Sequence, residues 1–355
     1  MKKSFLMLGL AVAAMSSCTN DEVIDLNQSN QKAIGFESFV NKGTRAATTV
    51  SNEVTSSNLN RFYVYGNDGV SDIFEDVSVI KSGENWVMQE AKEKYWETKE
   101  YKFAAYADGV GEAEHEASGI STSFEDGVLS FDDYTISTTQ AEQTDLIAAT
   151  IGRDNTNNFD VSKVSLGFKH LLSKVDFKFE NTNSVVNKTE LSMVITDVKL
   201  NVINKADCEY DANGVISWTL NGNEVEYALA QPTYGDSEDL FSGSGVLSST
   251  KKKFIIPAGK ESAISLEYFV IPEQTAATIE FHVAYYDNDG NLVEEYNKSI
   301  SLFPTVNQEV VTWTSSYIYK YNVQLPASPN KIEFTVKPIE GWQSQNVTLN
   351  GANAN

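Results

Sequence analysis

Histidine and cysteine are both scarce in this sequence of 355 residues, which contains three His and two Cys. His115, His170 and His282 lie far apart, and none stands in an H-E-x-x-H or similar metal-binding spacing, so we expect structural roles for them. The sequence also lacks a G-x-S-x-G elbow, a P-loop and a dinucleotide-binding fingerprint. These absences argue against an enzyme, and we expect no catalytic residue, no cofactor and no metal site.

The many carboxylates do not change this expectation. Asp287, Asp289 and Glu294 resemble part of a calcium loop, but Tyr285 stands where the first Asp of such a loop should be. A hairpin turn is the prediction for this segment. Neighbouring acidic residues on a strand point to opposite faces, so they do not form the paired carboxylates of a glycosidase.

Clustered positive charge is also missing. The formal net charge is -22, and the only basic run is Lys251-Lys252-Lys253. Because phosphate binding needs clustered Lys and Arg, we expect no nucleic acid as a partner.

The first 17 residues are predicted to be a lipoprotein signal peptide. They contain a basic start, an apolar run from Phe5 to Met15 and small residues before Cys18. This pattern resembles a bacterial lipobox, in which the cysteine is acylated and becomes the new N-terminus. The apolar run is shorter than the about 20 residues of a membrane span. With Cys18 acylated, Cys208 has no partner for an intramolecular disulfide.

No strongly periodic helix is visible, and the apolar residues instead alternate with polar ones, as in half-buried strands. Examples are Val164-Leu166-Phe168 and Val175-Phe177-Phe179. Turn signals such as Asn67-Asp68-Gly69 and Glu125-Asp126-Gly127 separate such runs. The sequence therefore predicts an all-β protein of sandwich type. Its length is enough for about two domains, with a junction near residue 170.

Arginine is as scarce as histidine, with three among the 27 Lys and Arg residues. Arg61 starts a predicted strand, and Arg153 is expected in a polar loop. Arg45 lies between small and polar residues, so the bond between Arg45 and Ala46 is expected to be the arginyl bond most accessible to a protease.

A predicted strand, Ala33 to Val40, directly precedes this bond. Ile34, Phe36 and Val40 lie on one face of it. Cleavage after Arg45 would remove this strand together with the acylated cysteine. The groove left behind should bind another strand.

A candidate donor strand lies near the other end of the chain. Ile332, Phe334 and Val336 repeat the Ile-x-Phe spacing of the first strand. The alternative is that this segment is the last strand of the second domain. A second short run, Val347-Thr348-Leu349, follows Pro338. A head-to-tail contact of this kind does not close, and so it generates a filament.

Several segments in order resemble the fimbrillin family of Bacteroidales, the subunits of type V pili. They are the lipobox, "IGFESFVNKGTRA", "LGFKHLLSKVDFKFEN" followed by "ITDVKLN", and "YKYNVQL" followed by "IEFTVKPIEGW". The resemblance implies two transthyretin-like β-sandwich domains, a lipoprotein precursor on the outer membrane at the cell surface, and a pilus after processing. Its implied partners are other pilin subunits, an arginine-specific protease, and a host or bacterial surface ligand.

Carried onto this sequence, the resemblance makes Cys18 the acylation site and Arg45 to Ala46 the cleavage site. The implied organisation is a signal peptide (1–17), a tether with a removable strand (18–45), an N-terminal sandwich (46–170) and a C-terminal sandwich (171–355) that ends in a donor segment (331–355). The alternative function is a surface glycan-binding lipoprotein with exposed, coplanar tryptophans. A hydrolase on a β-sandwich is a third reading, for which no residue constellation is present.

Overall fold

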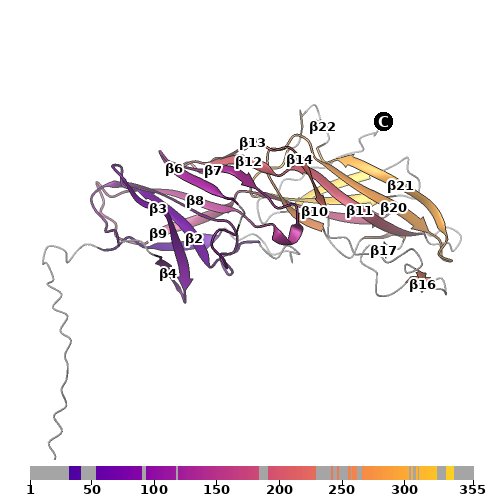
Figure 1. The fold of residues 1–355 in the computed structure, drawn as a ribbon, viewed down its shortest axis with the longest axis horizontal. Helices are drawn as coiled ribbons and strands as arrows, with labels where there is room; N and C mark the ends of the chain where they lie inside the picture. The colour runs from indigo at the N-terminus through magenta and orange to yellow at the C-terminus, as the bar shows by residue number, and fades with distance from the viewer. Residues whose placement is uncertain are drawn as a thin grey trace, which may run out of the picture.

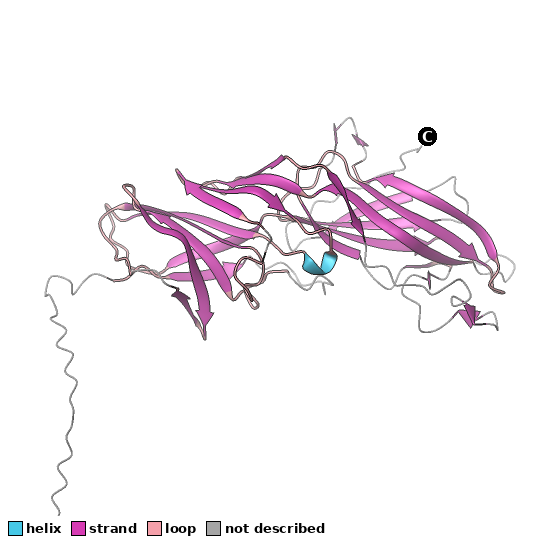
Figure 2. Ribbon diagram, in the orientation of Figure 1, coloured by secondary structure: helices cyan, strands magenta, loops and turns pink. Residues whose placement is uncertain are grey.

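The computed structural model describes residues 32–40, 53–89, 93–116, 119–183, 191–228, 266–303, 312–325 and 333–339, together with the short stretches 241–242, 246–247, 255–256, 258–261, 305–306 and 309–310. These residues form an elongated all-β molecule, with strands throughout and one short 3₁₀ helix, Gln140–Glu142 (Figures 1 and 2). The predicted fold class is confirmed. No described helix is long and apolar enough to cross a membrane.

One end of the molecule is built around a seven-stranded sheet and a smaller four-stranded sheet. The larger sheet has the order β1 (Phe36–Val40), β9 (Val164–His170), β8 (Ile147–Asp154), β5 (Glu100–Ala107), β2 (Arg61–Asn67), β3 (Asp72–Ser82) and β4 (Asn85–Met88). The smaller sheet has the order β13 (Ile216–Leu220), β12 (Lys205–Tyr210), β7 (Val128–Thr135) and β6 (Ser121–Glu125). Strand β12, which follows residue 170 in sequence, therefore pairs with β7, which precedes it, and β13 pairs with the other edge of β12. The exact domain junction stays a prediction.

The other end consists mainly of two further sheets. One has the order β18 (Lys260–Glu261), β10 (Ser173–Asn181), β24 (Ile318–Leu325) and β25 (Glu333–Ile339), with β19 (Leu266–Val270) also paired to β10. The other has the order β14 (Glu224–Ala228), β11 (Ser192–Ile203), β20 (Thr278–Tyr286) and β21 (Leu292–Ser301), with β17 (Ile255–Ile256) paired to β11. Two short pairs complete the strands, β15 (Phe241–Ser242) with β16 (Val246–Leu247) and β22 (Thr305–Val306) with β23 (Glu309–Val310).

Alternating sequence patterns explain most of these strands. In β9 the apolar residues Val164, Leu166 and Phe168 are buried while the residues between them are half-buried. The predicted turn at Asp126 and Gly127 joins β6 to β7, and both residues have positive φ, at 51° and 89°, as a tight hairpin turn requires.

The segment that resembled a calcium loop is a hairpin turn between β20 and β21, as predicted. The Asp287 carboxylate accepts hydrogen bonds from the backbone N–H groups of Asp289 and Asn291, at 2.9 and 2.8 Å. Among the described residues, no group of three or more His, Cys, Asp or Glu side chains is placed to hold a metal ion.

The buried side chains form two clusters on opposite faces of the seven-stranded sheet. Phe62, Val64 and Phe103 belong to the cluster that includes the first strand, whereas Tyr63 and Tyr106 belong to the other. The second cluster continues without a break into the sheets of β10 and β11, as far as Leu325. This continuous core joins the two ends of the molecule.

Candidate functional site: the β1 seat

Strand β1 contributes its predicted apolar face to the core. Ile34, Phe36 and Val40 are 1%, 2% and 4% exposed. The Phe36 ring meets the rings of Phe74 and Phe103 edge-on, with centroids 5.7 and 5.8 Å apart. Each such side chain contributes about 1.5 to 3 kcal/mol by leaving water. The first strand is therefore an integral part of this core.

One edge of β1 pairs with β9, and the pairing is parallel. The register runs from Phe36 opposite Val164 to Val40 opposite Phe168, and the Val164 N–H donates to the Gly35 carbonyl at 2.8 Å. All other partners in this sheet pair antiparallel. A parallel pair cannot be joined by a tight hairpin, and β1, the first described strand, is linked to the rest of its sheet by the chain that follows Val40.

Among the described residues, the opposite edge of β1 is held by hydrogen bonds at its two ends. Near the start, the Ile34 N–H donates to the Lys94 carbonyl at 2.7 Å, and the Trp96 N–H donates to the Lys32 carbonyl at 3.1 Å. At the end, the Val40 N–H donates to Ser56 Oγ at 2.9 Å, and the Ser56 hydroxyl donates back to the Val40 carbonyl at 3.0 Å.

We call the surfaces that hold residues 32–40 the β1 seat. They are strand β9, the segment Lys94–Trp96, Ser56 and the aromatic floor of Phe74 and Phe103. The strand itself starts at Phe36, later than the predicted Ala33, because Ala33 turns to the other edge and forms an isolated bridge with Tyr95.

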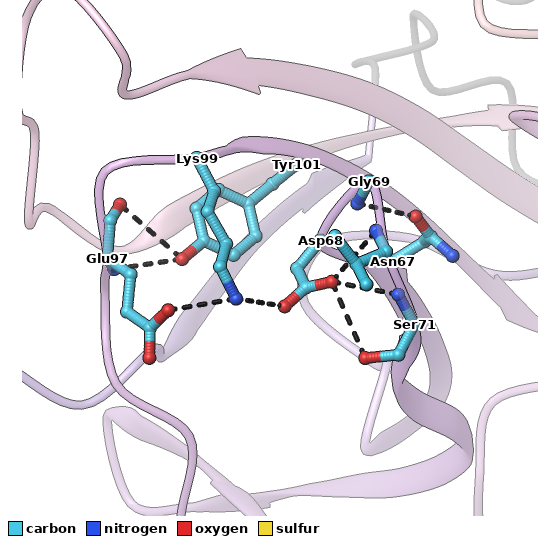
Figure 3. Close-up of polar contacts among 8 residues, drawn as sticks. Asn67, Asp68, Gly69, Ser71, Glu97, Lys99 and Tyr101 are labelled. Atoms are coloured by element: carbon cyan, nitrogen blue, oxygen red, sulfur yellow. Dashed lines mark hydrogen bonds and ion pairs between the residues drawn. The ribbon is translucent and has the colours of Figure 1, made fainter.

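A polar network holds the segment that carries Lys94 and Trp96 (Figure 3). Lys99 Nζ lies 2.6 Å from Asp68 Oδ2 and 2.8 Å from Glu97 Oε2. The Glu97 N–H donates to the Tyr101 hydroxyl at 2.8 Å, and the Ser71 N–H donates to Asp68 Oδ1 at 2.9 Å. The network ties the residues just after Trp96 to the turn between β2 and β3.

This network also shifts the pKa values of its charged groups. Burial raises the pKa of Asp68, but the hydrogen bonds from Lys99 and from the backbone N–H groups of Ser71 and Val70 outweigh it, and the pKa lies below its ordinary value. Hydrogen bonds to Asp68 and Glu97 raise the pKa of Lys99. Both groups are therefore ionised across the neutral range.

The residues just after the expected cleavage site are anchored separately from β1. Lys174, which is 1% exposed, places Nζ 2.8 Å from Glu53 Oε2 and 3.5 Å from Glu267 Oε2. The Val54 N–H donates to the buried carboxylate of Asp145 at 3.0 Å. Residues 53 and 54 are thus attached to groups outside β1. Sequence reasoning missed this cluster, because no local pattern brings together residues this far apart.

Of the three arginines, two are described and both lie in strands. Arg61 begins β2, as predicted, and its guanidinium pairs with Glu114 at 2.9 Å. The loop prediction for Arg153 was wrong, because it lies in β8, where its guanidinium stacks 4.6 Å from the Trp96 ring and donates to the Ser162 carbonyl at 2.8 Å. Cys18 and the bond between Arg45 and Ala46 lie outside the described residues, so their predicted roles stay predictions.

The C-terminal candidate donor is in part described. Phe334 and Val336 lie in β25, which pairs antiparallel with β24 from Glu333 opposite Gln324 to Ile339 opposite Ile318. Ile332 lies outside the described residues. Strand β25 is the edge strand of its sheet.

The described tryptophans do not form the exposed platform that glycan binding would require. Trp96, Trp218 and Trp313 are buried, at 1%, 5% and 1% exposed. Trp86 is half-buried against the Phe62 ring, with centroids 4.7 Å apart. Trp342 lies outside the described residues. Among the described tryptophans, packing is the role that the structure supports.

These features define a structural β-sandwich protein whose first strand pairs with a neighbouring strand along one edge and is held on the other edge at its two ends. A family model described as fimbrillin-like matches residues 44–342, and the chain belongs to this family. It is a subunit of a cell-surface pilus and a structural protein, not an enzyme.

Solved structures of other proteins align with most of the chain. A fimbrial protein from Bacteroides vulgatus is 14% identical, with 88% of this chain and 100% of that chain covered and a TM-score of 0.52, which supports the fold. The fimbrial anchor protein Mfa2 from Porphyromonas gingivalis is 12% identical, with 89% and 100% covered and a TM-score of 0.34. No curated protein matches the chain.

Proposed function

We propose that the chain is the precursor of a pilus subunit that polymerises by strand exchange at the β1 seat. In this proposal Cys18 is acylated and holds the precursor on the outer membrane, and a protease that is specific for arginine cleaves between Arg45 and Ala46. The segment 18–45 then leaves with β1. A segment from residues 331–355 of another copy takes its place.

The observation that carries the proposal is the attachment of β1. It is a parallel edge strand whose apolar face is buried, yet the chain that links it to the next strand, β2, passes through the expected cleavage site. Cleavage there removes β1 without breaking the connection between any two other strands.

The energetics favour replacement of β1 over an empty seat. Loss of Ile34, Phe36 and Val40 gives up about 5 to 8 kcal/mol of burial before hydrogen bonds are counted. It also exposes the backbone edge of β9. A strand from a neighbouring copy restores both, as in other systems that add a strand to a sheet.

The part of the chain that remains after cleavage is attached to residues outside β1. Glu53 and Val54 contact Lys174 and Asp145, which lie outside β1, so we expect these contacts to remain after β1 leaves. Arg61 and Arg153 lie in strands that are hydrogen-bonded to neighbouring strands. These segments are therefore not free to enter the active site of a protease. Cleavage is therefore directed to Arg45.

The proposal divides the mature subunit into an N-terminal sandwich from residue 46 to near 170 and a C-terminal sandwich from there to 355. Repetition of the contact from copy to copy gives an open filament, because the donor and the seat are different surfaces. Adhesion to a host or bacterial surface is the role of such a pilus.

Limited digestion tests the proposal. The purified chain without its signal peptide is treated with an arginine-specific protease and examined by intact mass and by gel electrophoresis with and without heating. We expect one cut after Arg45 and a ladder of oligomers that resist SDS until heated. Arg45→Ala should abolish both results, whereas Arg153→Lys should change neither. Resistance of Arg45 to cleavage, or a cut protein that remains monomeric at high concentration, would overturn the proposal.

A further inference from the structure

The two edge strands of the seven-stranded sheet, β1 and β4, lie close together. Their Cα atoms approach within 8 Å, which is less than the about 10 Å that separates sheets packed face to face. Strand β4 therefore lies beside the free edge of β1, and the sheet curls almost into a barrel around the core cluster that contains Phe36. Figure 1 shows β4 and β9 at the same end of the molecule.

The segment that follows β4 in sequence extends this contact along β1. Tyr95 forms an antiparallel bridge with Ala33, and two backbone hydrogen bonds flank the bridge. Among the described residues, no backbone hydrogen bond joins β4 itself to β1, so β4 contacts β1 without pairing with it. Strand β9 therefore lies along one edge of β1, and β4 lies beside the other.

Strand β4 has the direction and the faces that pairing with β9 requires. Each of the five steps from β9 through β8, β5, β2 and β3 to β4 is antiparallel, so β4 and β9 run in opposite directions. Trp86 and Met88 pack against the core cluster that contains Phe168 of β9. Val87, which is 43% exposed, and Lys169, which donates to the Gly214 carbonyl, face away from that cluster.

The contacts of β1 also define an alignment between β4 and β9. The bridge at Tyr95 and the register of β1 on β9 relate the two outer segments to each other through β1. Counted along the chain, this relation sets Met88 opposite Phe168 and Val87 opposite Lys169. Directly opposite residues of an antiparallel pair share a face, and both pairs meet this condition.

We propose that β4 pairs with β9 when β1 leaves the β1 seat, so that the remaining six strands close into a barrel. The movement is about one strand spacing, or about 4.8 Å. Closure restores hydrogen bonds at the edge of β9, but it does not replace the buried side chains of Ile34, Phe36 and Val40. A strand that enters the seat can therefore displace β4 again.

The use of this closure rests on the proposed function. A subunit that has lost β1 exposes the edge of β9 and the apolar surface beneath it, and such an edge invites aggregation. Closure by β4 covers the edge until another strand enters. The closure itself requires only that β1 leaves its seat, so it can be tested without cleavage.

A disulfide between Val87→Cys and Lys169→Cys tests the closure in the uncut chain that begins at Thr19. While β1 lies between β4 and β9, the two positions are about two strand spacings apart, beyond the reach of a disulfide. Phe36→Asp places a charge at a position that is 2% exposed, so β1 should leave the seat. Cys208 is buried and should not react.

We expect at least tenfold more disulfide with Phe36→Asp than without it, read as a mobility shift on non-reducing gels. Val87→Cys with Ser165→Cys is the matched control, because Ser165 lies on the same strand four residues out of alignment, and it should form little disulfide. No increase with Phe36→Asp, or a stronger disulfide at Ser165, would overturn the closure in this alignment. Circular dichroism checks that the Phe36→Asp variants are folded.

Hydrogen exchange in the cut chain is a second measurement that does not use Phe36→Asp. The Gln89 N–H donates to Ser78 of β3, so the N–H of Met88 points to the free edge of β4. Met88→Pro removes this donor and should block closure while it spares the pairing with β3.

After cleavage at Arg45 and removal of the fragment that carries β1, residues 164–168 should exchange at least tenfold more slowly in the wild type than in Met88→Pro. In the uncut chain the two proteins should exchange alike there, because β1 covers β9 in both. Equal exchange in the two cut proteins would overturn the closure. Resistance of Arg45 to cleavage would instead overturn the proposed function, and the disulfide test in the uncut chain would still decide on the closure.

Discussion

Phe36 and Phe39 are close neighbours on β1, but they face opposite sides of the sheet. This difference decides how much each side chain contributes to stability. Phe36 is 2% exposed and packs on two other rings, whereas Phe39 is 47% exposed. We expect Phe36→Ala to lower the free energy of unfolding of the uncut chain by about 3 to 5 kcal/mol. Phe39→Ala should cost about 1 kcal/mol or less.

Chemical unfolding of the two variants checks this difference. After cleavage at Arg45 and removal of β1, the same variants should unfold alike, since both side chains are then absent. A persistent difference between the cut variants would show that Phe36 does not act through the β1 seat.

Asp68 gives a prediction for pH dependence at the same scale. Its pKa is lower in the folded chain than the ordinary value of 3.8, so its stabilising effect is fully present above that value and is lost as pH falls through the folded pKa. The pKa of Lys99 is raised, so its contribution persists throughout the neutral range and is lost only at very high pH.

Asp68→Asn should therefore reduce stability at neutral pH, and the difference from wild type should shrink as the pH falls below 3.8. Urea unfolding at a series of pH values measures it, with Asp72→Asn on the same turn as a matched control. A difference that is independent of pH would contradict the ionic role of Asp68.

At the scale of elements, local pattern predicted the strands well and their partners poorly. The alternating runs in β9 and β10 and the turn at Asp126 and Gly127 follow from spacing alone. The strand at Arg153 was missed because the end of β8 is only partly buried and does not alternate clearly.

The predicted face of Ile34, Phe36 and Val40 is buried as expected, but the sequence gives no sign that β1 pairs with β9 or that the pairing is parallel. Ser56 has no sequence signal either. Its two hydrogen bonds to Val40 form because the fold places Ser56 beside a residue 16 positions earlier in the sequence. Such contacts are set by the tertiary fold and are not encoded locally.

Strand β1 itself can be tested as a separable element. A chain that begins at Ala46 should be less stable than one that begins at Thr19. A synthetic peptide of residues 32–41 should raise the melting temperature of the shorter chain by several degrees. The same peptide with Phe36→Ala should have much less effect, because the aromatic floor of the β1 seat is left unfilled. A truncated chain as stable as the longer one would show that β1 is not part of the folded core.

At the scale of the whole molecule, the continuous core predicts that both ends unfold together. Trp218 lies at the middle of this connection, where its Nε1–H lies 3.1 Å from both the Leu171 carbonyl and Ser315 Oγ. It comes from β13 of the four-stranded sheet, whereas its partners lie just before β10 and β24 of the sheet at the other end. A joint of this kind resists bending, which suits a subunit that transmits force along a pilus.

Calorimetry of the uncut chain should give one transition, and Trp218→Ala should lower stability by about 3 to 5 kcal/mol. In that variant the transition should broaden or split, because the two ends lose a shared contact. Trp86→Ala, which lies at the edge of the seven-stranded sheet and away from the joint, should lower stability while leaving a single transition. Two separate transitions in the wild-type chain would mean that the shared core does not couple the sandwiches, and the stiffness of the filament would then have to come from the contacts between subunits.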